Sequence, residues 1–403
     1  MRPLLPALKH LILKQHRKQD ARDGAVWWPI YPLFVMLFVM LPVMHPAWAQ
    51  EREIDEITNS FSSFTDEEQR DKIDFVAVPL PMSNPTLGTG MAAGLMVLYP
   101  QQGEAPASNT IVGGFYTSSD SWAIGVTQKN YLREDRLRLG ATAAYAELNF
   151  DFWGIGTDAG DNDVFVGIKQ TGLILKPELL WETLDNLFIG PQALLLYGET
   201  SADSTLPGDG GPDDIVNATG DLANIGLGLA IDYDTRDNPL NASTGWFVEG
   251  DVLFYRNSWG SDVDYERYIL TANNYLRITK NQVVAWQVSG CAVNGDAPFY
   301  QLCMFGASRI IRGYPVGRYL DQRMLAGQAE WRWSFRPRWG VVAFGGLGQV
   351  GQNFSDFKSD NILVSGGVGL RWMASVENRV NLSVDYALGE KDNYLYIYVG
   401  EAF

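Results

Sequence analysis

The sequence of 403 residues predicts an all-β fold: a 16-stranded antiparallel β-barrel that spans a membrane. Three observations predict it. Apolar residues alternate with polar or small ones through most of the chain, as they do in strands with two different faces. Aromatic residues gather at the ends of these segments, and the connections between segments alternate between short turns and long polar loops. Sixteen is an even number, so the first and last strands of the chain begin and end on the same side of the membrane.

Composition excludes several other classes of protein. Outside one early stretch the chain has no run of eighteen apolar residues, so it cannot be a multi-span helical membrane protein, which needs about 20 per crossing. The 13 Trp, 18 Tyr and 19 Phe exclude a disordered chain. A net charge of −16 argues against a nucleic-acid partner.

Residues 1–49 are predicted to be a signal peptide. Six basic residues precede an apolar stretch from Val26 to Met44, and a small-x-small cleavage site ends at Ala49. The alternative, a membrane anchor helix, is disfavoured by four prolines between residues 29 and 46. Cleavage removes six basic and two acidic residues, so 354 residues remain with 25 basic and 45 acidic side chains, a net charge of −20.

The mature chain retains none of the three histidines, since His10, His16 and His45 all precede the cleavage site. Histidine-dependent catalysis and histidine metal sites are therefore excluded. A carboxylate-only hydrolase is the one enzyme alternative left. We expect no enzyme activity, no metal and no cofactor.

Residues 50–71 are polar and acidic, and we expect a short periplasmic segment there, followed by the barrel over residues 72–403. The strands are expected at residues 73–80, 87–98, 109–117, 121–130, 134–148, 163–178, 186–199, 220–233, 245–257, 263–279, 282–294, 321–335, 340–352, 361–373, 376–388 and 392–403.

The apolar face of these strands is expected to point outward to lipid rather than inward as in a soluble sandwich. Short connections at 280–281 and 337–340 contrast with long ones at 200–221 and 296–321, as in outer-membrane barrels. Closure follows, because an open sheet edge in hydrocarbon leaves backbone groups without partners. The aromatic residues expected at the membrane interfaces are Trp122, Trp246, Trp331, Trp333, Trp339, Trp372, Tyr394 and Tyr396.

The long connection 296–321 contains the sequence Arg-Ile-Ile-Arg-Gly-Tyr at residues 309–314. Gly313 permits a backbone turn that a Cβ would block, Tyr314 supplies a rigid anchor, and Arg312 brings a planar, always-charged fork. This stretch resembles the [VIL]-R-G-[YF] motif of the outer-membrane assembly-factor barrels, the BamA/TamA superfamily, also called bacterial surface antigen. In that family the motif lies on the sixth extracellular loop, and this connection is the sixth external one in our strand count.

Two other stretches are similar to the same family, and the resemblance covers about residues 73–403. Residues 234–240 (Asp-Thr-Arg-Asp-Asn-Pro-Leu), followed by Gly245 and Trp246, resemble a periplasmic turn of the family. The C-terminal residues Leu395, Ile397, Val399 and Phe403 resemble its barrel-targeting signal, a last strand that ends in Phe.

The resemblance implies that the sixth loop folds into the lumen, where Arg312 needs acidic partners because an unpaired buried guanidinium is costly. In the family these partners lie on the next two strands. Glu330 has the right parity on the first of them, but Gly346 stands where the family has Asp on the second. We therefore expect the anchoring of Arg312 either to be weaker or to be rerouted, with Asp385 as the candidate partner. The alternative is that Arg312 and Tyr314 simply plug the barrel.

Cys291 and Cys303 lie twelve positions apart at the start of this loop. An exported protein meets an oxidising compartment, so a disulfide is plausible there, and one of this loop length contributes roughly 3 kcal/mol. Two unrelated reduced thiols are the alternative.

The resemblance also implies a function in the bacterial outer membrane: helping polypeptides to insert into it or cross it, through a separable seam between the first and last strands. The expected partners are membrane lipid, unfolded outer-membrane polypeptides, and a separate periplasmic receptor or accessory subunit, because this chain lacks the family's periplasmic repeat domains. The alternative is an outer-membrane channel or a structural surface barrel without insertase activity.

Overall fold

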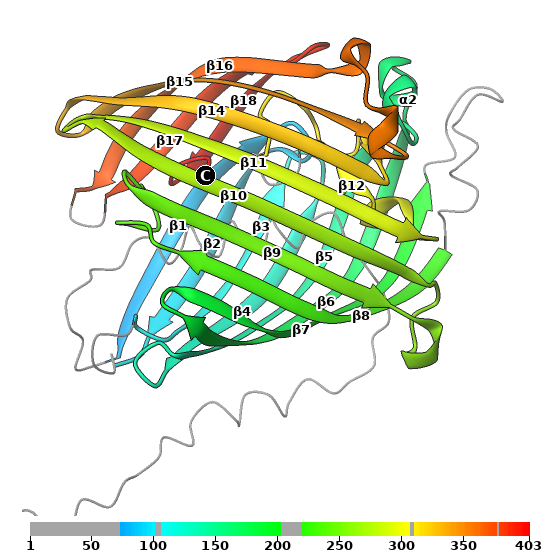
Figure 1. Cartoon of the computed structure of the whole chain (residues 1–403), viewed down its shortest axis with the longest axis horizontal. Coiled ribbons are helices and arrows are strands. Elements are labelled where there is room, and N and C mark those ends of the chain that lie inside the picture. The colour runs from blue at the N-terminus through cyan, green and yellow to red at the C-terminus, as the bar shows by residue number, and fades with distance from the viewer. Residues whose placement is uncertain (1–72, 101–105, 203–219, 307–309, 377–378) are drawn as a thin grey trace, which may run out of the picture. The chain divides into compact units, whose positions relative to one another are not determined.

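A computed structural model describes residues 73–100, 106–202, 220–306, 310–376 and 379–403. Sixteen antiparallel strands form a closed barrel, which confirms the predicted fold class and strand number (Figure 1). The predicted signal peptide and the segment 50–71 lie outside the described residues. Within the described ranges, no helix is long and apolar enough to cross a membrane.

Each barrel strand pairs with its neighbours in the sequence, and β1 closes on β18. The barrel strands are β1 (Asp74–Asn84), β2 (Gly88–Leu98), β3 (Asn109–Thr117), β4 (Trp122–Leu132), β5 (Leu137–Phe152), β6 (Val166–Leu184), β7 (Leu187–Ala202), β8 (Gly220–Asp234), β9 (Gly245–Tyr255), β10 (Tyr265–Thr279), β11 (Gln282–Gly295), β14 (Arg323–Arg336), β15 (Trp339–Gly351), β16 (Leu363–Ser375), β17 (Val380–Leu388) and β18 (Asn393–Val399).

The long connection between β11 and β14 forms a small sheet of its own. It consists of β12 (Cys303–Met304) and β13 (Leu320–Asp321), which pair antiparallel, so β11 pairs directly with β14. This connection lies at the end of the barrel that we call the loop end. The opposite end, with tight turns such as 280–281 and with both residue 73 and residue 403, we call the turn end.

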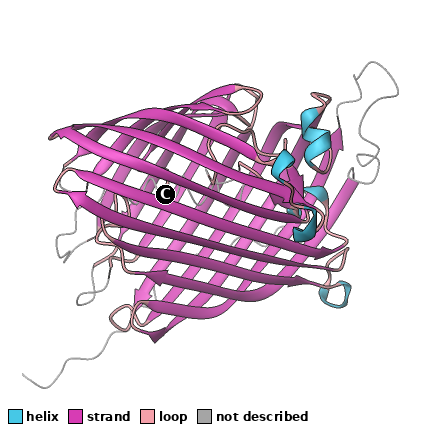
Figure 2. Cartoon of the chain, turned by 45° about the horizontal axis from the view of Figure 1, so that its top comes forward, coloured by secondary structure: helices cyan, strands magenta, loops and turns pink. Residues whose placement is uncertain are grey.

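Short helices gather at the loop end (Figure 2). They are α2 (Thr157–Asp161) and the 3-10 turns η2 (Asn257–Trp259), η3 (Phe299–Gln301), η5 (Phe354–Asp356) and η6 (Ser359–Asn361). The loops at this end therefore carry structure of their own.

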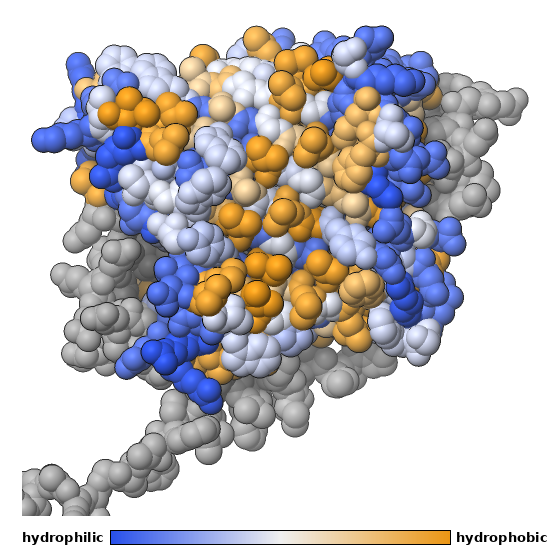
Figure 3. All heavy atoms as spheres, in the orientation of Figure 1, coloured by the Kyte–Doolittle hydropathy of each residue, from blue (hydrophilic) through white to orange (hydrophobic). Residues whose placement is uncertain are grey.

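Side chains on the barrel wall have the arrangement expected of a membrane protein. On β14, Leu325 and Trp331 point outward and are exposed, whereas Glu330 and Arg332, on either side of Trp331, are buried. Hydrophobic residues cover the middle of the visible outer face and hydrophilic ones gather towards its two ends (Figure 3). Because alternate residues of a strand point to opposite faces, this pattern places the charged residues inside the barrel.

Of the aromatic residues predicted at the membrane interfaces, some are exposed on the outer face and others are not. Trp246, Trp331, Trp333, Trp339 and Trp372 are exposed. Tyr396, however, is buried, and it shares its face of β18 with the half-buried Tyr394. These tyrosines point into the barrel, because the outward face of β18 belongs to Leu395.

The first and last strands also differ from their predicted bounds. The first strand runs to Asn84 instead of residue 80, and the last strand ends at Val399 instead of residue 403. Gly400 has a φ of +89°, a conformation that residues with a Cβ rarely adopt. The chain leaves the wall at this glycine, so Phe403 is not part of the last strand.

Candidate functional site

Arg312 is fully buried and joins three strands of the wall. Its Nη1 donates to Asp385 Oδ2 on β17 and its Nη2 to Glu330 Oε2 on β14, both at 2.6 Å. The guanidinium carbon lies 3.5 Å from the ring centroid of Phe344 on β15. The planar fork thus holds two carboxylates while its face stacks on an aromatic ring.

The structure shows why no aspartate is needed at Gly346. A Cβ there would lie 2.7 Å from Ile311 Cδ1 and 2.9 Å from Gln328 Cβ. Ile311, the residue before the arginine, therefore fills the space that a side chain at 346 would occupy. Asp385 supplies the second carboxylate from another strand.

The pair of carboxylates belongs to a larger buried network. Arg371 Nη1 donates to Asp385 Oδ1 and its Nε to Glu401 Oε2, the latter at 2.8 Å. Arg332 Nε donates to Glu330 Oε1 at 2.5 Å and lies 3.8 Å from Glu401. Tyr398 Oη donates to Asp385 Oδ2 at 2.6 Å. Three arginines thus alternate with three carboxylates, which is the condition under which buried charges are tolerated.

Gly313 and Tyr314 contact β18 and β16, the two strands that flank β17. Gly313 has a φ of +107°, and its N–H donates to Tyr396 Oη on β18 at 2.8 Å. Tyr314 Oη donates to the carbonyl of Val364 on β16 at 2.7 Å. Farther along, the N–H of Val316 donates to Thr86 Oγ1 in the turn between β1 and β2, at 2.8 Å. The segment 310–320 therefore contacts β18 and the β1–β2 turn together.

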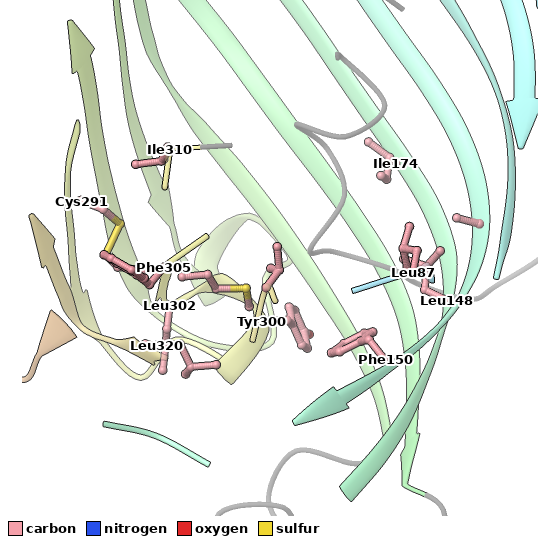
Figure 4. Close-up of a cluster of buried hydrophobic side chains, with 14 of the residues drawn as sticks. Leu87, Leu148, Phe150, Ile174, Cys291, Tyr300, Leu302, Phe305, Ile310 and Leu320 are labelled. Carbon is pink, nitrogen blue, oxygen red and sulfur yellow. A yellow bond between two sulfur atoms is a disulfide. The ribbon is translucent and has the colours of Figure 1, made fainter. Parts of the chain in front are cut away.

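Apolar side chains hold the connection 296–322 against the wall (Figure 4). Phe299 packs on Phe152 of β5 with ring centroids 4.5 Å apart, and Phe305 packs on Tyr314 at 5.0 Å. Leu87, from the β1–β2 turn, belongs to the same buried cluster. At the loop end, Tyr319 Oη donates to Asp161 of α2 at 2.9 Å.

Cys291 and Cys303 form a disulfide in the structure, with an S–S distance of 2.04 Å and Cα atoms 5.6 Å apart. Cys291 lies on β11 and Cys303 on β12, so the bond attaches the start of the connection to the wall. The two cysteines are twelve positions apart in the sequence.

At the turn end, the stretch 235–244 is organised around Asp237. Its carboxylate accepts the N–H groups of Ser243 and Thr244 at 2.7 and 3.0 Å, and it pairs with Arg277 at 2.9 Å and Arg379 at 3.0 Å. Partial burial alone raises the pKa of Asp237, but the hydrogen bonds from Ser243 and Thr244 and from Arg379 outweigh it and hold the pKa well below the usual range. Arg379 lies in the β16–β17 turn, so the contact reaches across from β8–β9.

The four residues of the proposed targeting signal do not share one environment. Leu395 is exposed, Ile397 is half-buried and Val399 is buried. Phe403 packs beside Ala242, Tyr275 and Ala285, and its backbone oxygen accepts a hydrogen bond of 2.6 Å from Arg332 Nη2.

Several members of the network were missed by the sequence analysis. Phe344, Arg371 and Glu401 lie far from the motif in sequence. Strand parity assigns Phe344 and Arg371 only to the inner face, and it would assign Glu401 to the outer face with Leu395, because the turn at Gly400 does not show in the alternation. Among the described residues, no group of three His, Cys, Asp or Glu side chains is placed to hold a metal ion.

Comparison with known proteins gives one family match and several similar structures. Residues 112–403 match the family described as the Omp85 superfamily domain. BamA from Haemophilus ducreyi lacking POTRA domains 1–3 has a similar structure, with 13% identity, a TM-score of 0.58, and coverage of 82% of this chain and 70% of that chain. CdiB from Acinetobacter baumannii (12%, TM-score 0.51) and CdiB from Escherichia coli (11%, TM-score 0.52) are also similar over 82% of this chain, which spans 60% and 63% of theirs. A search of curated protein sequences finds no match.

Proposed function

The chain belongs to the Omp85 superfamily of outer-membrane barrels, a family of non-enzymatic assembly and transport proteins, and from this premise we propose that it helps polypeptides to insert into or cross the bacterial outer membrane through the seam between β1 and β18. The single observation that carries the proposal is the pairing of these two strands. β1 pairs with β2 at eleven positions, whereas its ladder with β18 holds one pair of described residues, Ser83 with Ile397.

A seam with so short a ladder is the place where the wall separates most easily. Every other neighbouring pair in the barrel has at least seven paired positions, as β17 and β18 do. Each backbone hydrogen bond contributes about 0.5–1.5 kcal/mol net in water, and an unpaired strand edge is a template for another strand. An incoming polypeptide strand that pairs with β1 therefore replaces few existing bonds.

The connection 296–322 is proposed to be the sixth extracellular loop, folded into the lumen. This assigns the loop end to the cell surface and the turn end to the periplasm. The hydrogen bonds from Gly313 to Tyr396 and from Val316 to Thr86 support it, because they attach one segment to both sides of the seam. In this position the segment restrains the seam while the Arg312 network holds the segment.

The clients in this proposal are unfolded outer-membrane polypeptides, and membrane lipid surrounds the barrel. A separate periplasmic receptor or accessory subunit is proposed to deliver the clients. The targeting role of Leu395, Ile397, Val399 and Phe403 is also part of the proposal. It acts before the barrel closes, while the C-terminal stretch is still extended.

A disulfide across the seam tests the mechanism. Ser83 and Ile397 are directly opposed, so the pair Ser83→Cys and Ile397→Cys locks β1 to β18. The matched control is Ser83→Cys with Thr89→Cys, which locks β1 to β2 at another directly opposed pair. The readout is the rate at which a urea-unfolded outer-membrane barrel folds into vesicles that contain the variant.

We expect the seam lock to abolish the acceleration of folding and the β1–β2 lock to preserve it. Reduction should restore the first variant to the level of the second. If both oxidised variants accelerated folding equally, the seam mechanism would be contradicted.

A further inference from the structure

At the turn end, the β10–β11, β14–β15 and β16–β17 turns surround a pocket of about 330 Å³. Seven of its lining side chains are cationic, and among the described residues the only lining carboxylate is that of Glu401. The chain as a whole has a net charge of −16. A positive pocket in an acidic protein requires anions to neutralise it, and these can be followed residue by residue.

The cations in the deeper part of the pocket already have partners. Arg332 and Arg371 belong to the buried network with Glu330, Asp385 and Glu401. Arg277 and Arg379 share the carboxylate of Asp237. These four side chains therefore leave little uncompensated charge.

The cations at the rim are different. Lys280, Arg336 and Arg338 are exposed, and none of them forms an ion pair with a described residue. Arg338 uses Nη1 to donate to the carbonyls of Met373 and Ala374, at 3.1 and 3.2 Å, which fixes its position without neutralising its charge. Three exposed positive charges on adjoining turns are therefore not neutralised by any described carboxylate.

One carboxylate of the chain is already bound in the deeper part of the pocket. Glu401, near the C-terminus, reaches in so that its Oε2 accepts from Arg371 Nε at 2.8 Å and its Oε1 from Asn381 Nδ2 at 2.5 Å. The deep half of the pocket thus already binds a carboxylate carried by a polypeptide. The rim continues the same surface and lacks its own carboxylate.

We propose that the rim binds the acidic segment of this same chain that precedes β1, residues 51–71. The segment holds eight carboxylates, among them Asp66, Glu67 and Glu68, against two arginines. It enters the barrel at Asp74, which lies at the turn end as the pocket does. β1 is separated from β15 by β18, β17 and β16, four strand spacings or about 20 Å, and twenty residues of extended chain span up to about 66 Å.

A cross-link in the full-length protein tests this docking. Asn281 lines the pocket, and Ser62 lies between the two acidic clusters of the segment. The two native cysteines are joined to each other, so Ser62→Cys and Asn281→Cys leave one pair of thiols free to react. Disulfide formation within one chain is measured in neutral detergent and in vesicles that contain phosphatidylglycerol. Ser62→Cys with Glu134→Cys, on the β4–β5 turn, serves as the reference for chance encounters.

We expect efficient cross-linking at residue 281 and little at residue 134. Adding Lys280→Gln, Arg336→Gln and Arg338→Gln should lower the yield at least about fivefold, because each exposed ion pair is weak but three are lost together. The control Arg133→Gln with Arg136→Gln removes two exposed cations from the β4–β5 turn and should change nothing.

Four results would overturn the proposal. One is an equal yield at residues 281 and 134. Another is a yield that ignores the three rim substitutions. Loss of the cross-link in phosphatidylglycerol vesicles would assign the rim to lipid phosphates, and cross-links formed only between two chains would assign it to a partner in trans. None of these readouts depends on the insertase activity proposed above.

Discussion

The wall from β14 to β17 and the seam between β1 and β18 are built in opposite ways. In the first region, β14 and β15 are paired at thirteen positions, and Arg312, Arg332 and Arg371 bind carboxylates on the inner face. In the second, one ladder position joins the strands. The contrast shows that strand pairing and buried ion pairs are concentrated between β14 and β17. The seam between β1 and β18 has few of these interactions and is therefore the easiest place for the wall to separate.

The segment 310–320 connects the two regions. It is held through Arg312 by the strongly paired sector and reaches the seam through Gly313 and Val316. Changes to this segment should therefore affect both regions. Changes confined to the β14–β17 wall or to the seam should affect only that region.

Replacing residues 304–320 by Gly-Gly should have the largest effect. Cys303 and Asp321 are directly opposed, so two residues can join them as a hairpin and the disulfide is retained. We expect low conductance of the intact protein in planar bilayers and a markedly higher conductance of the variant, because the buried segment is gone. A large, stable conductance of the intact protein would instead favour the channel alternative.

Arg312→Ala should destabilise the barrel by about 3–5 kcal/mol, the cost of leaving Glu330 and Asp385 buried without their shared cation. The measurement is the urea midpoint of unfolding in detergent. Arg312→Lys keeps the charge but loses the planar fork, so its effect should be smaller. Arg133→Ala, at an exposed turn, should be neutral. A midpoint for Arg312→Ala equal to that of Arg133→Ala would contradict a structural role of the network.

Asp237→Asn should cost about 1 kcal/mol at pH 7, because the carboxylate is partly exposed and its ion pairs are screened. The pKa of Asp237 is lowered in the folded state, so its contribution is complete above the ordinary carboxyl pKa of about 4 and is lost as pH falls below it. The difference in unfolding free energy between wild type and variant should therefore shrink from pH 7 to pH 3. A difference that is constant with pH would be inconsistent with this carboxylate acting through its charge.

Tyr396→Phe should have the smallest effect, about 0.5–1.5 kcal/mol, since it removes one hydrogen bond from Gly313 to β18. It should also loosen the seam, so a cysteine at residue 397 should react faster with a thiol reagent. Tyr394→Phe on the same strand face is the control, because Tyr394 Oη bonds to Asp392 instead. Equal reactivity in both variants would show that the Tyr396 hydroxyl does not restrain the seam.

Local pattern determined much of this protein. Alternation with a period of two residues is a property of the chain itself, so it predicted a closed barrel of sixteen strands and the inward position of Glu330. The motif around Arg312 identified the segment that contacts the network. The same reasoning failed at the last strand, where Gly400 turns the chain inward and the aromatic residue Phe403 no longer follows the alternation.

Only the tertiary structure decided which inward residues meet. Arg371 joins Asp385 to Glu401, Ile311 fills the space at Gly346, and Lys280 lines one rim with Arg336 and Arg338. Parity assigns a side chain to the inner face, but its height and neighbours depend on the tilt and stagger of all the strands together. The short ladder of the seam has the same origin, because the stagger that closes the barrel leaves β1 and β18 opposed at one described position.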